Sequence, residues 1–354
     1  MIRIGVSGAG AWGQNLLRNV DANEATELVA VCDPDAAARK RVAARYTDAK
    51  VYEAFECMLG DRRLDAVIVA SPPCFHFDQA KKAIDAGLHV LVEKPMCKLR
   101  KEAQELVRLA DGAGRVLMAG HTFLYSNLVH EVKRCIDSGE LGDVMYIHSQ
   151  RLNLGRVRRD VDAMWNFAPH DISITCYLLD AWPQRVNARG ASFIQRADDI
   201  ADVAFFQMDF ADGRMMGGHV SWLDPQKVRR MVIVGSEKML VYDDVDSLRH
   251  IQVYDKSVEV EFQSTAKNFP DFRTRIRAGD LRIPTIGLVE PLGVEISHFA
   301  ECIETGAAPR SDGRNGLHVV CVLEAMAESM VKGGAVVEVD YGGTVVQPQL
   351  CEAS

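Results

Sequence analysis

The feature that most constrains the fold lies at the start of the chain, in "IRIGVSGAGAWGQNLLRNV" (residues 2–20). A short apolar run leads into Gly8, Gly10 and Gly13, and an amphipathic stretch follows. A strand, a GxGxxG turn and a helix in this order are typical of a dinucleotide-binding unit. The glycines permit a tight turn, the approach of a pyrophosphate and close packing of helix on strand. We expect the phosphates at the helix N-terminus, where free amides favour anions.

An acidic residue, Asp33, ends the next apolar run, "LVAVCDPD" (residues 28–35). A carboxylate at the end of the second strand hydrogen-bonds the adenosine ribose of NAD and repels the 2'-phosphate of NADP. Asp35 adds to this repulsion, whereas Arg39 and Lys40 one turn later keep NADP open as the less favoured cofactor. The sequence therefore predicts NAD.

Apolar runs alternate with amphipathic stretches up to residue 120, which predicts a parallel sheet covered by helices on both faces. The expected strands are 64–71, 88–95 and 115–120, and the expected helices are 36–46, 77–87 and 101–114. Such sheets bind ligands beyond the carboxyl ends of their strands, where "SPPCFH" (71–76) and "EKP" (93–95) stand. The predicted cofactor contacts are Gly8, Gly10, Ala11, Trp12, Gly13, Asp33, Ser71, Pro72, His76, Glu93 and Lys94.

The pattern changes after residue 120, where several segments alternate apolar and polar residues. These segments are 203–222, with a turn at 211–213, then 229–244 and 250–262. Period-two alternation predicts a largely antiparallel sheet with one covered and one free face. We expect helices at 127–139, 164–180, 293–306 and 316–334, and an irregular, functional loop at 264–290 that carries Arg273, Arg275, Arg277 and Arg282.

Length and composition limit the classes of protein. A chain of 354 residues exceeds one hydrophobic core, and we predict domains at 1–120 and 121–354. The net charge of -8 argues against general nucleic-acid binding, and no apolar run is long enough to cross a membrane. The start of the chain is a strand and turn rather than a signal peptide. Nine scattered cysteines without zinc or redox spacing predict a reducing, cytoplasmic location and no metal site.

Two residues are candidates for proton chemistry. Lys94 follows an apolar strand and precedes Pro95, whose peptide bond is a candidate for the cis form, and we expect the lysine to project toward the nicotinamide. His170 stands in "MWNFAPHDISITCYLLD" (164–180), on what should be the first turn of an apolar helix. From that stretch alone, His170 is either a general base or a structural histidine, and Asn166 is either a substrate contact or a helix cap.

Taken together, the motifs resemble the Gfo/Idh/MocA oxidoreductase family. The matching segments are "GAGAWG", "SPPCFH", "EKP", "GHTFLYSNLVHEVKRCIDSGELGDV", "APHDISITCYLL" and "GDLRIPTIGLVEPLGVEISHF", and they run along the whole chain. The resemblance implies an α/β fold, with an N-terminal Rossmann domain and a C-terminal α/β domain whose large, mostly antiparallel sheet has an open face. It also implies a homodimer or homotetramer formed through that face, and hydride transfer between a nicotinamide cofactor and a ring hydroxyl of a sugar or inositol.

By the same resemblance, Lys94 and His170 are the catalytic pair, with His170 as the base. Many members have an aspartate four residues before this histidine, where the chain has Asn166. An amide cannot act as a base, so His170 is expected to be the sole one. Tyr125 is predicted among the substrate contacts.

The segment "QRLNLGRVRRDVDAMWNFAPHDIS" (150–173) predicts the substrate class. It looks like that of members that oxidise carbon 3 of a hexose in amino-sugar pathways, and its residues Arg151, Asn153, Arg156, Arg158 and Arg159 are suited to a diphosphate or carboxylate. This favours a nucleotide-activated sugar. An assembled aminoglycoside-type glycoside, and inositol or a sugar phosphate, stay open as alternatives. A non-catalytic, NAD-binding regulator is the alternative of another class.

Overall fold

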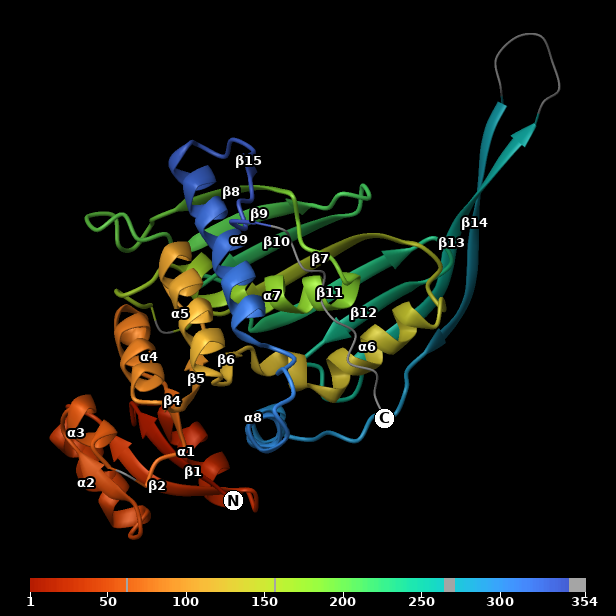
Figure 1. Cartoon of the computed structure of the whole chain (residues 1–354). Coiled ribbons are helices and arrows are strands. Elements are labelled where there is room, and N and C mark those ends of the chain that lie inside the picture. The colour runs from red at the N-terminus through yellow and green to blue at the C-terminus, as the bar shows by residue number, and fades with distance from the viewer. Residues whose placement is uncertain (62, 156, 264–270, 344–354) are drawn as a thin grey trace.

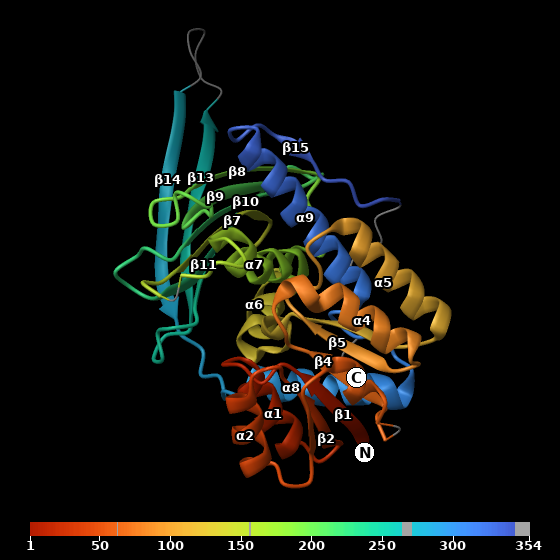
Figure 2. The ribbon, with the colours of Figure 1, turned by 90° about the vertical axis from the view of Figure 1, so that its left-hand side faces the viewer.

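The computed structural model describes residues 1–343 apart from 62, 156 and 264–270, and leaves out residues 344–354. The described chain forms two β-sheets that lie side by side, with helices between and around them (Figures 1 and 2). The first sheet is parallel and the second is mostly antiparallel, which confirms the predicted fold class.

The first sheet has six strands in the order β3-β2-β1-β4-β5-β6, and every pairing in it is parallel. Its strands are β1 (Ile2–Ser7), β2 (Thr26–Cys32), β3 (Lys50–Tyr52), β4 (Ala66–Val69), β5 (His89–Glu93) and β6 (Leu117–Gly120). The order reverses beside β1, between β2 and β4. In such a sheet the crevice at the reversal, beyond the carboxyl strand ends, is the place for a ligand.

Five helices connect these strands: α1 (Gly13–Ala22), α2 (Ala36–Arg45), α3 (Phe55–Leu59), α4 (His76–Asp85) and α5 (Arg100–Ala113). The strands are apolar on both faces because helices cover both faces; the four residues of β4 and the last four of β5 are all buried. Asp35 begins α2 by accepting hydrogen bonds from the amides of Ala37 and Ala38.

The second sheet has nine strands in the order β14-β13-β12-β11-β7-β10-β9-β8-β15, antiparallel apart from the β7–β10 pair. Its central strands are β7 (Val144–Leu152), β8 (Arg185–Ala191), β9 (Val203–Asp209), β10 (Met215–Ser221), β11 (Val228–Gly235) and β12 (Met239–Asp243). Three helices, α6 (Asn127–Asp137), α7 (Ala163–Leu179) and α9 (Gly313–Val331), lie on one face, and the opposite face carries no helix of the described chain (Figures 1 and 2).

One predicted loop is a strand over much of its length. Residues 271–282, expected to be irregular, form β14 (Asp271–Arg282) and pair with β13 (Ile251–Gln263) in a ribbon that projects beyond the sheet (Figure 1). Arg273, Arg275 and Arg277 recur at every second position there, which is the periodicity of a strand with charged residues in place of apolar ones. Residues 283–290 have no regular structure, as expected, whereas 264–270 lie outside the described residues.

The last two long helices link the sheets. Helix α8 (Pro291–Thr305) buries Ile296 and Phe299 in the same core as Ile4 and Leu17 of the first sheet and α1. Helix α9 (Gly313–Val331) has residues in the cores beneath both sheets. The packing therefore crosses the predicted domain boundary at residue 120, and β15 (Val337–Glu338) then ends the second sheet beside β8.

Phe299→Ala tests this dependence of the first sheet on a C-terminal helix. Phe299 is fully buried. Its truncation is expected to lower the free energy of unfolding by about 3–5 kcal/mol, because apolar contacts are lost and a cavity remains. Denaturant unfolding followed by circular dichroism measures the change. The control is Val331→Ala on the exposed end of α9, 89% accessible, for which a change within about 0.5 kcal/mol is expected.

Candidate active site

The glycine-rich turn between β1 and α1 has the geometry of a phosphate-binding loop. Gly8 has a φ of 99°, and a Cβ atom there would lie 2.6 Å from the carbonyl oxygen of Ala70. A Cβ on Gly13 would lie 2.0 Å from the oxygen of Gly8, so only glycine lets α1 start this close to the strand. At Gly10 a Cβ would meet no atom within 4 Å, because this position faces open space. The turn thus leaves room for a phosphate at the start of α1.

Asp33 lies next to this turn, as predicted. Its carboxylate is mostly buried, and it accepts hydrogen bonds from the amides of Ala9 (2.7 Å) and Asp35 (2.8 Å). Arg39, which kept NADP open in the sequence, directs its guanidinium to the carbonyl oxygens of Asp33 and Pro34 and to the Glu53 carboxylate. The guanidinium is therefore committed within the protein, and the negative charge of Asp33 dominates the ribose end of the site, which fits NAD.

Glu93 lies at the carboxyl end of β5 and joins two loops of the cofactor cleft. The indole Nε1 of Trp12 donates a hydrogen bond to its carboxylate, which also accepts from the Lys94 amide at 3.1 Å. Burial raises the pKa of Glu93. Ala11 is exposed and Trp12 is 46% exposed, so the predicted contacts from the glycine-rich turn lie on the accessible side of the cleft.

His76, predicted to contact the cofactor, is buried and serves the scaffold instead. Its ring nitrogens lie 2.8 Å from the carbonyl oxygens of Pro95 and Ser71, so the imidazole ties the loop after β4 to the loop after β5. Ser71 is half-buried and Pro72 exposed, which leaves them at the cleft as expected. The error arose because spacing does not reveal which way a side chain points after a strand. The Lys94–Pro95 peptide is cis, which confirms that prediction.

Lys94 and His170 come together from different halves of the chain. The ammonium of Lys94 donates a hydrogen bond to the backbone oxygen of Asn166, at 2.8 Å, and His170 lies one helical turn further along α7. The helix starts earlier than predicted, at Ala163, with Asp162 as its N-cap accepting from the amide of Trp165. His170 is therefore two turns into the helix rather than on the first, and Asn166 is not the cap.

The pKa values of Lys94 and His170 are both lower than usual. Burial is the main cause that lowers the pKa of Lys94 to about 8; Glu93 opposes this shift, and the nearby arginines add to it. Burial, and after it the charge of Lys94, lowers the pKa of His170 well below 6.5. At neutral pH His170 is therefore an uncharged acceptor beside a predominantly protonated lysine. Its Nδ1 is buried without a hydrogen-bond partner among the described residues.

Two further residues of this region did not stand out in the sequence. His121 follows β6, is buried, and places Nδ1 2.7 Å from Oδ1 of Asn315; burial lowers its pKa to about 4. Arg229 of β11 is paired with Asp244 at 3.0 Å and lowers the pKa of both Lys94 and His170. The sequence alone could not identify either residue, because each reaches the site only when segments that are distant in sequence become adjacent in the fold.

Several predicted substrate contacts already have partners within the protein. Arg151 is buried and forms an ion pair with Asp171 at 3.0 Å, so its guanidinium is not free for an anion. Arg158 is paired with Asp160. Tyr125 is 2% exposed, with its hydroxyl 2.9 Å from that of Ser311, and this burial removes it from the substrate contacts. These partners could not be seen in a linear sequence.

The remaining candidates of this segment differ in accessibility. Asn153 is half-buried, and its backbone N–H donates to the backbone oxygen of Ser221 at 3.1 Å, which ties this residue to the end of β10. Arg159 is exposed. Arg156 lies outside the described residues. Of the arginines predicted to hold an anion, Arg159 is thus the described one that has an exposed side chain and no carboxylate partner within the described chain.

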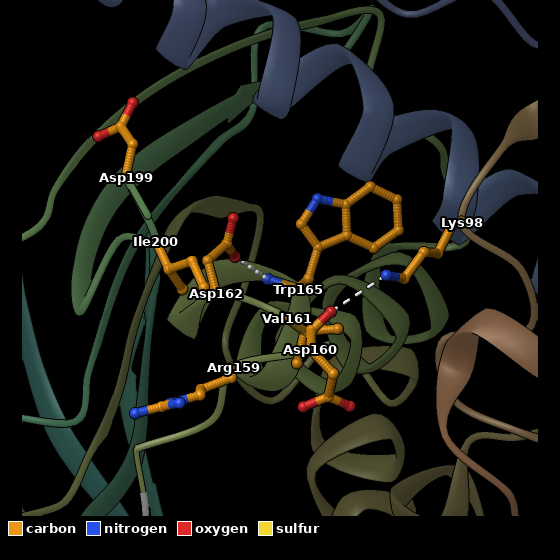
Figure 3. Close-up of a pocket in the computed structure, with 8 residues that line it drawn as sticks. All are labelled: Lys98, Arg159, Asp160, Val161, Asp162, Trp165, Asp199 and Ile200. Atoms are coloured by element: carbon orange, nitrogen blue, oxygen red, sulfur yellow. Dashed lines mark hydrogen bonds between the residues drawn. The ribbon is translucent and has the colours of Figure 1, made fainter. Parts of the chain in front are cut away.

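A cavity of about 360 Å³ opens beside the start of α7 (Figure 3). The lining residues are Lys98, Arg159, Asp160, Val161, Asp162, Trp165, Asp199 and Ile200. The indole of Trp165 and the amine of Lys98 converge on it in Figure 3, and Lys98 donates to the oxygen of Asp160 at 3.0 Å. Trp165, which lines the cavity, belongs to the same helix as Asn166 and His170. Its volume falls in the range of about 300–1,000 Å³ usual for small-molecule sites.

The described residues contain no group of three or more histidine, cysteine or acidic side chains placed to hold a metal ion. In the same part of the chain, no helix has the length and apolar character needed to span a bilayer.

Comparison with known proteins gives two matches to the GFO/IDH/MocA family. Residues 2–121 match the profile described as "Oxidoreductase family, NAD-binding Rossmann fold", and residues 129–241 match that of a GFO/IDH/MocA C-terminal domain. The two matches together span more than half of the chain. They identify the first sheet and its glycine-rich turn as an NAD-binding unit.

Individual relatives are distant. An uncharacterized oxidoreductase of Streptococcus pneumoniae is 27% identical over 60% of this chain, and the match spans only 61% of that relative. The UDP-N-acetylglucosamine 3-dehydrogenase of Acidithiobacillus ferrooxidans is 28% identical over 71% of this chain and 76% of its own. Its solved structure superposes with a TM-score of 0.74 over 93% of this chain and 98% of that one, at 25% identity. GenD2 from gentamicin A biosynthesis, in complex with NAD, shares the fold with a TM-score of 0.80 at 22% identity, over 96% of each chain.

Asp33→Asn tests the cofactor preference. The amide keeps the size of the side chain and one acceptor oxygen but removes the charge that repels a 2'-phosphate. The ratio of NAD to NADP affinity is expected to fall at least tenfold, about 1.4 kcal/mol, as measured by titration of intrinsic fluorescence. Asp48→Asn, an exposed change after α2, is the control. A tighter affinity for NADP than for NAD in the unmodified protein contradicts the assignment.

Proposed function

The chain belongs to the Gfo/Idh/MocA oxidoreductase family, and from this premise we propose that it oxidises a secondary ring hydroxyl of a sugar or cyclitol, with NAD as the oxidant. One observation carries the proposal. A protonated Lys94 and an uncharged His170 lie together at the carboxyl end of β5, beside the cleft of the NAD-binding unit. This pair has the charges needed to remove a proton from an alcohol and to stabilise the oxygen that loses it.

The reaction divides between the side chains and the cofactor. His170 accepts the hydroxyl proton on an imidazole nitrogen, which is possible because the ring is neutral at the working pH. Lys94 donates a hydrogen bond to the same oxygen and offsets its developing negative charge. The nicotinamide supplies the acceptor for the hydride that leaves the carbon. The alcohol thus loses a proton and a hydride and becomes a ketone.

The substrate class that we propose is a hexose oxidised at carbon 3 while attached to a nucleotide, in amino-sugar or antibiotic biosynthesis. The named activity of the Acidithiobacillus relative supports this class. The cavity lined by Trp165 supports a substrate that extends beyond one ring, because Trp165 lies on the same helix as His170 and the cavity is large enough for a further group. Lys98 and the exposed Arg159 supply positive charge there for a diphosphate.

An assembled aminoglycoside-type glycoside is the second candidate, and the composition of the same cavity favours it. Asp160, Asp162 and Asp199 line the cavity together with the Trp165 indole. Carboxylates bind protonated amines, and an indole face packs against the apolar face of a sugar ring. Inositol or a sugar phosphate is the third candidate. A non-catalytic NAD-binding regulator is disfavoured, because it has no need of the Lys94–His170 pair.

A substrate panel tests the proposal. The purified protein is incubated with NAD and, in turn, UDP- and dTDP-hexoses, aminoglycosides, inositols and hexose phosphates, and absorbance at 340 nm is followed. Turnover of a nucleotide sugar above that of the free hexose is the expected result. Preferred turnover of an aminoglycoside or of inositol selects the second or third candidate. NAD binding without turnover of any compound favours the regulator.

Lys94→Ala and His170→Ala are each expected to lower kcat at least a hundredfold while NAD still binds, because acid–base groups contribute about 10²–10⁴-fold.

The two pKa shifts also predict how activity depends on pH. Activity requires neutral His170, so it falls only at a pH well below 6.5, and it requires protonated Lys94, so it falls above about pH 8. Lys94→Arg should extend activity to higher pH, because a guanidinium does not titrate there.

The control is Lys101→Ala on the exposed side of α5, for which an unchanged kcat and pH profile are expected. A kcat near that of the unmodified protein in either alanine variant removes that residue from the proposed chemistry.

We also propose that the open face of the second sheet joins copies of the chain into a homodimer or homotetramer. Tyr146 and Met215 are partners across β7 and β10 and are 44% and 42% exposed. Phe205 of β9 is 56% exposed and stacks on His219 at 4.1 Å between ring centroids. Large apolar side chains gathered on a flat sheet face mark an interface between proteins.

Phe205→Asp combined with Tyr146→Asp is expected to reduce the assembly to monomers, because charges would be buried at the interface. Size-exclusion chromatography with light scattering gives the mass, and circular dichroism checks the fold. Leu248→Asp, at an 85% exposed position beyond β12, should leave the assembly unchanged. An unmodified protein that is monomeric contradicts the proposal.

For the cellular location, we infer the cytoplasm from the cysteines. They are spread along the chain without the spacing of a disulfide framework, and Cys97, Cys135 and Cys176 are buried. Thiols of this kind persist in a reducing compartment. Cell fractionation with an antibody against the protein tests the location.

A further inference from the structure

A buried ion pair lies close to His170 and has no part in the reaction described above. Arg151 of β7 directs Nε and Nη2 to the carboxylate of Asp171 on α7, at distances from 3.0 to 3.3 Å. Arg151 is 6% exposed and Asp171 is 1% exposed. Removing both charges from water costs about as much as their attraction returns, and apolar residues of the same size are often as stabilising. The pair therefore calls for an explanation other than stability.

The ion pair is connected to His170 through an aromatic ring. The guanidinium of Arg151 lies 4.7 Å from the centre of the Phe123 ring. The Phe123 ring meets the imidazole of His170 edge to face, with centroids 5.0 Å apart and an angle of 73° between the rings. Asp171 is the next residue after His170, so the series of contacts from Asp171 through Arg151 and Phe123 to His170 begins and ends on consecutive residues of α7. Phe123 lies on η2 (Thr122–Tyr125), directly after the first sheet, and thus joins the two halves of the protein at this point.

His170 depends on these contacts for its orientation. A catalytic histidine is commonly held by a carboxylate or carbonyl that accepts from its second nitrogen. Here Nδ1 of His170 has no such partner among the described residues, and the residue one turn earlier is Asn166 rather than an acid. Phe123 is the ring contact that the structure gives this imidazole. The Arg151 guanidinium packs in turn over the Phe123 ring.

We propose that Arg151, held by Asp171, is a positioning residue that orients the His170 imidazole through Phe123. Four groups act electrostatically on this ring: Lys94 after β5, Arg151 of β7, His121 after β6 and Arg229 of β11. Arg229 is offset by Asp244, and His121 is held neutral by its own burial. Arg151, although paired with Asp171, is the first arginine among the groups that lower the pKa of His170. The proposal rests on the assignment of His170 as the base.

Two substitutions separate orientation from charge. The double variant Arg151→Met/Asp171→Leu replaces the ion pair with apolar side chains of similar size and is expected to fold. It should lower kcat at least tenfold, with little change in the affinity for NAD, and should move the acidic limb of the pH profile upward by at least half a unit. Phe123→Leu keeps an apolar contact but loses the ring edge, and it should lower kcat without moving the acidic limb.

The titration of His170 is measured directly by NMR on protein labelled with ¹⁵N-histidine, with the signal assigned through His170→Gln. This readout does not need turnover. The double variant is expected to raise the midpoint of the titration, and Phe123→Leu to leave it unchanged. Arg3→Met, which breaks a 2.7 Å ion pair with Asp65 in the first sheet, is the control and should change neither kcat nor the titration.

The possible outcomes distinguish the two proposals. If the unmodified protein turns over no compound, the proposed function fails, while the titration still supports or overturns the role of Arg151. If the double variant folds with unchanged kcat and an unchanged titration, Arg151 is not a positioning residue. If the double variant does not fold, Arg151→Lys serves in its place: it keeps the charge but loses the planar stacking, so kcat should fall and the titration should stay. An unchanged kcat in that variant overturns the proposal.

Discussion

One hydrogen bond between the two halves of the chain organises the site: the ammonium of Lys94 donates to the backbone oxygen of Asn166. The lysine belongs to the loop after β5 of the NAD-binding unit, and its acceptor belongs to α7, which lies on the second sheet. Neither half contains both residues of the proposed catalytic pair. The bond requires the two sheets to keep a fixed relation, and α9, whose residues pack in the cores under both, provides it. Helix α9 therefore helps to hold Lys94 and its acceptor in place, although it supplies neither of them.

The electrostatics of the site follow from burial in this junction. Lys94, His170 and His121 all have a lowered pKa, and burial is the first cause for each. Arg151 and Arg229 lie close by, yet each is matched by a carboxylate, Asp171 or Asp244. The arginines thus shape the potential around the base without offering a free charge to the substrate. A neutral acceptor beside a cationic donor is the arrangement that alcohol oxidation needs.

The sequence predicted those parts of the fold and site that depend on local pattern. The GxGxxG turn, Asp33, the parallel strands and the hairpin turn at 211–213 are encoded within a few residues each, and the structure has them in place. Residues whose role depends on a distant partner were misjudged. Tyr125 binds Ser311, 186 positions away, and Arg151 binds Asp171 on another element. The periodicity of the sequence does not reveal such pairings, because the packing of the two sheets determines them. The same reason hid His121, which acquires its neighbours only when β6 and α9 meet.

The amide at position 166 gains its meaning from this geometry. Asn166 holds Lys94 through its backbone oxygen, which any residue could supply, so this contact does not depend on the Asn166 side chain. A carboxylate at this position would give Lys94 a counter-ion and raise its pKa. With an amide at this position, the pKa of Lys94 is lowered to about 8, and the neighbouring arginines contribute to this shift. A modest rise in pH above neutrality therefore removes the proton of the Lys94 ammonium. In the mechanism that we propose, the amide thus leaves His170 as the one base, and the pKa of Lys94 sets the upper pH at which that base can work.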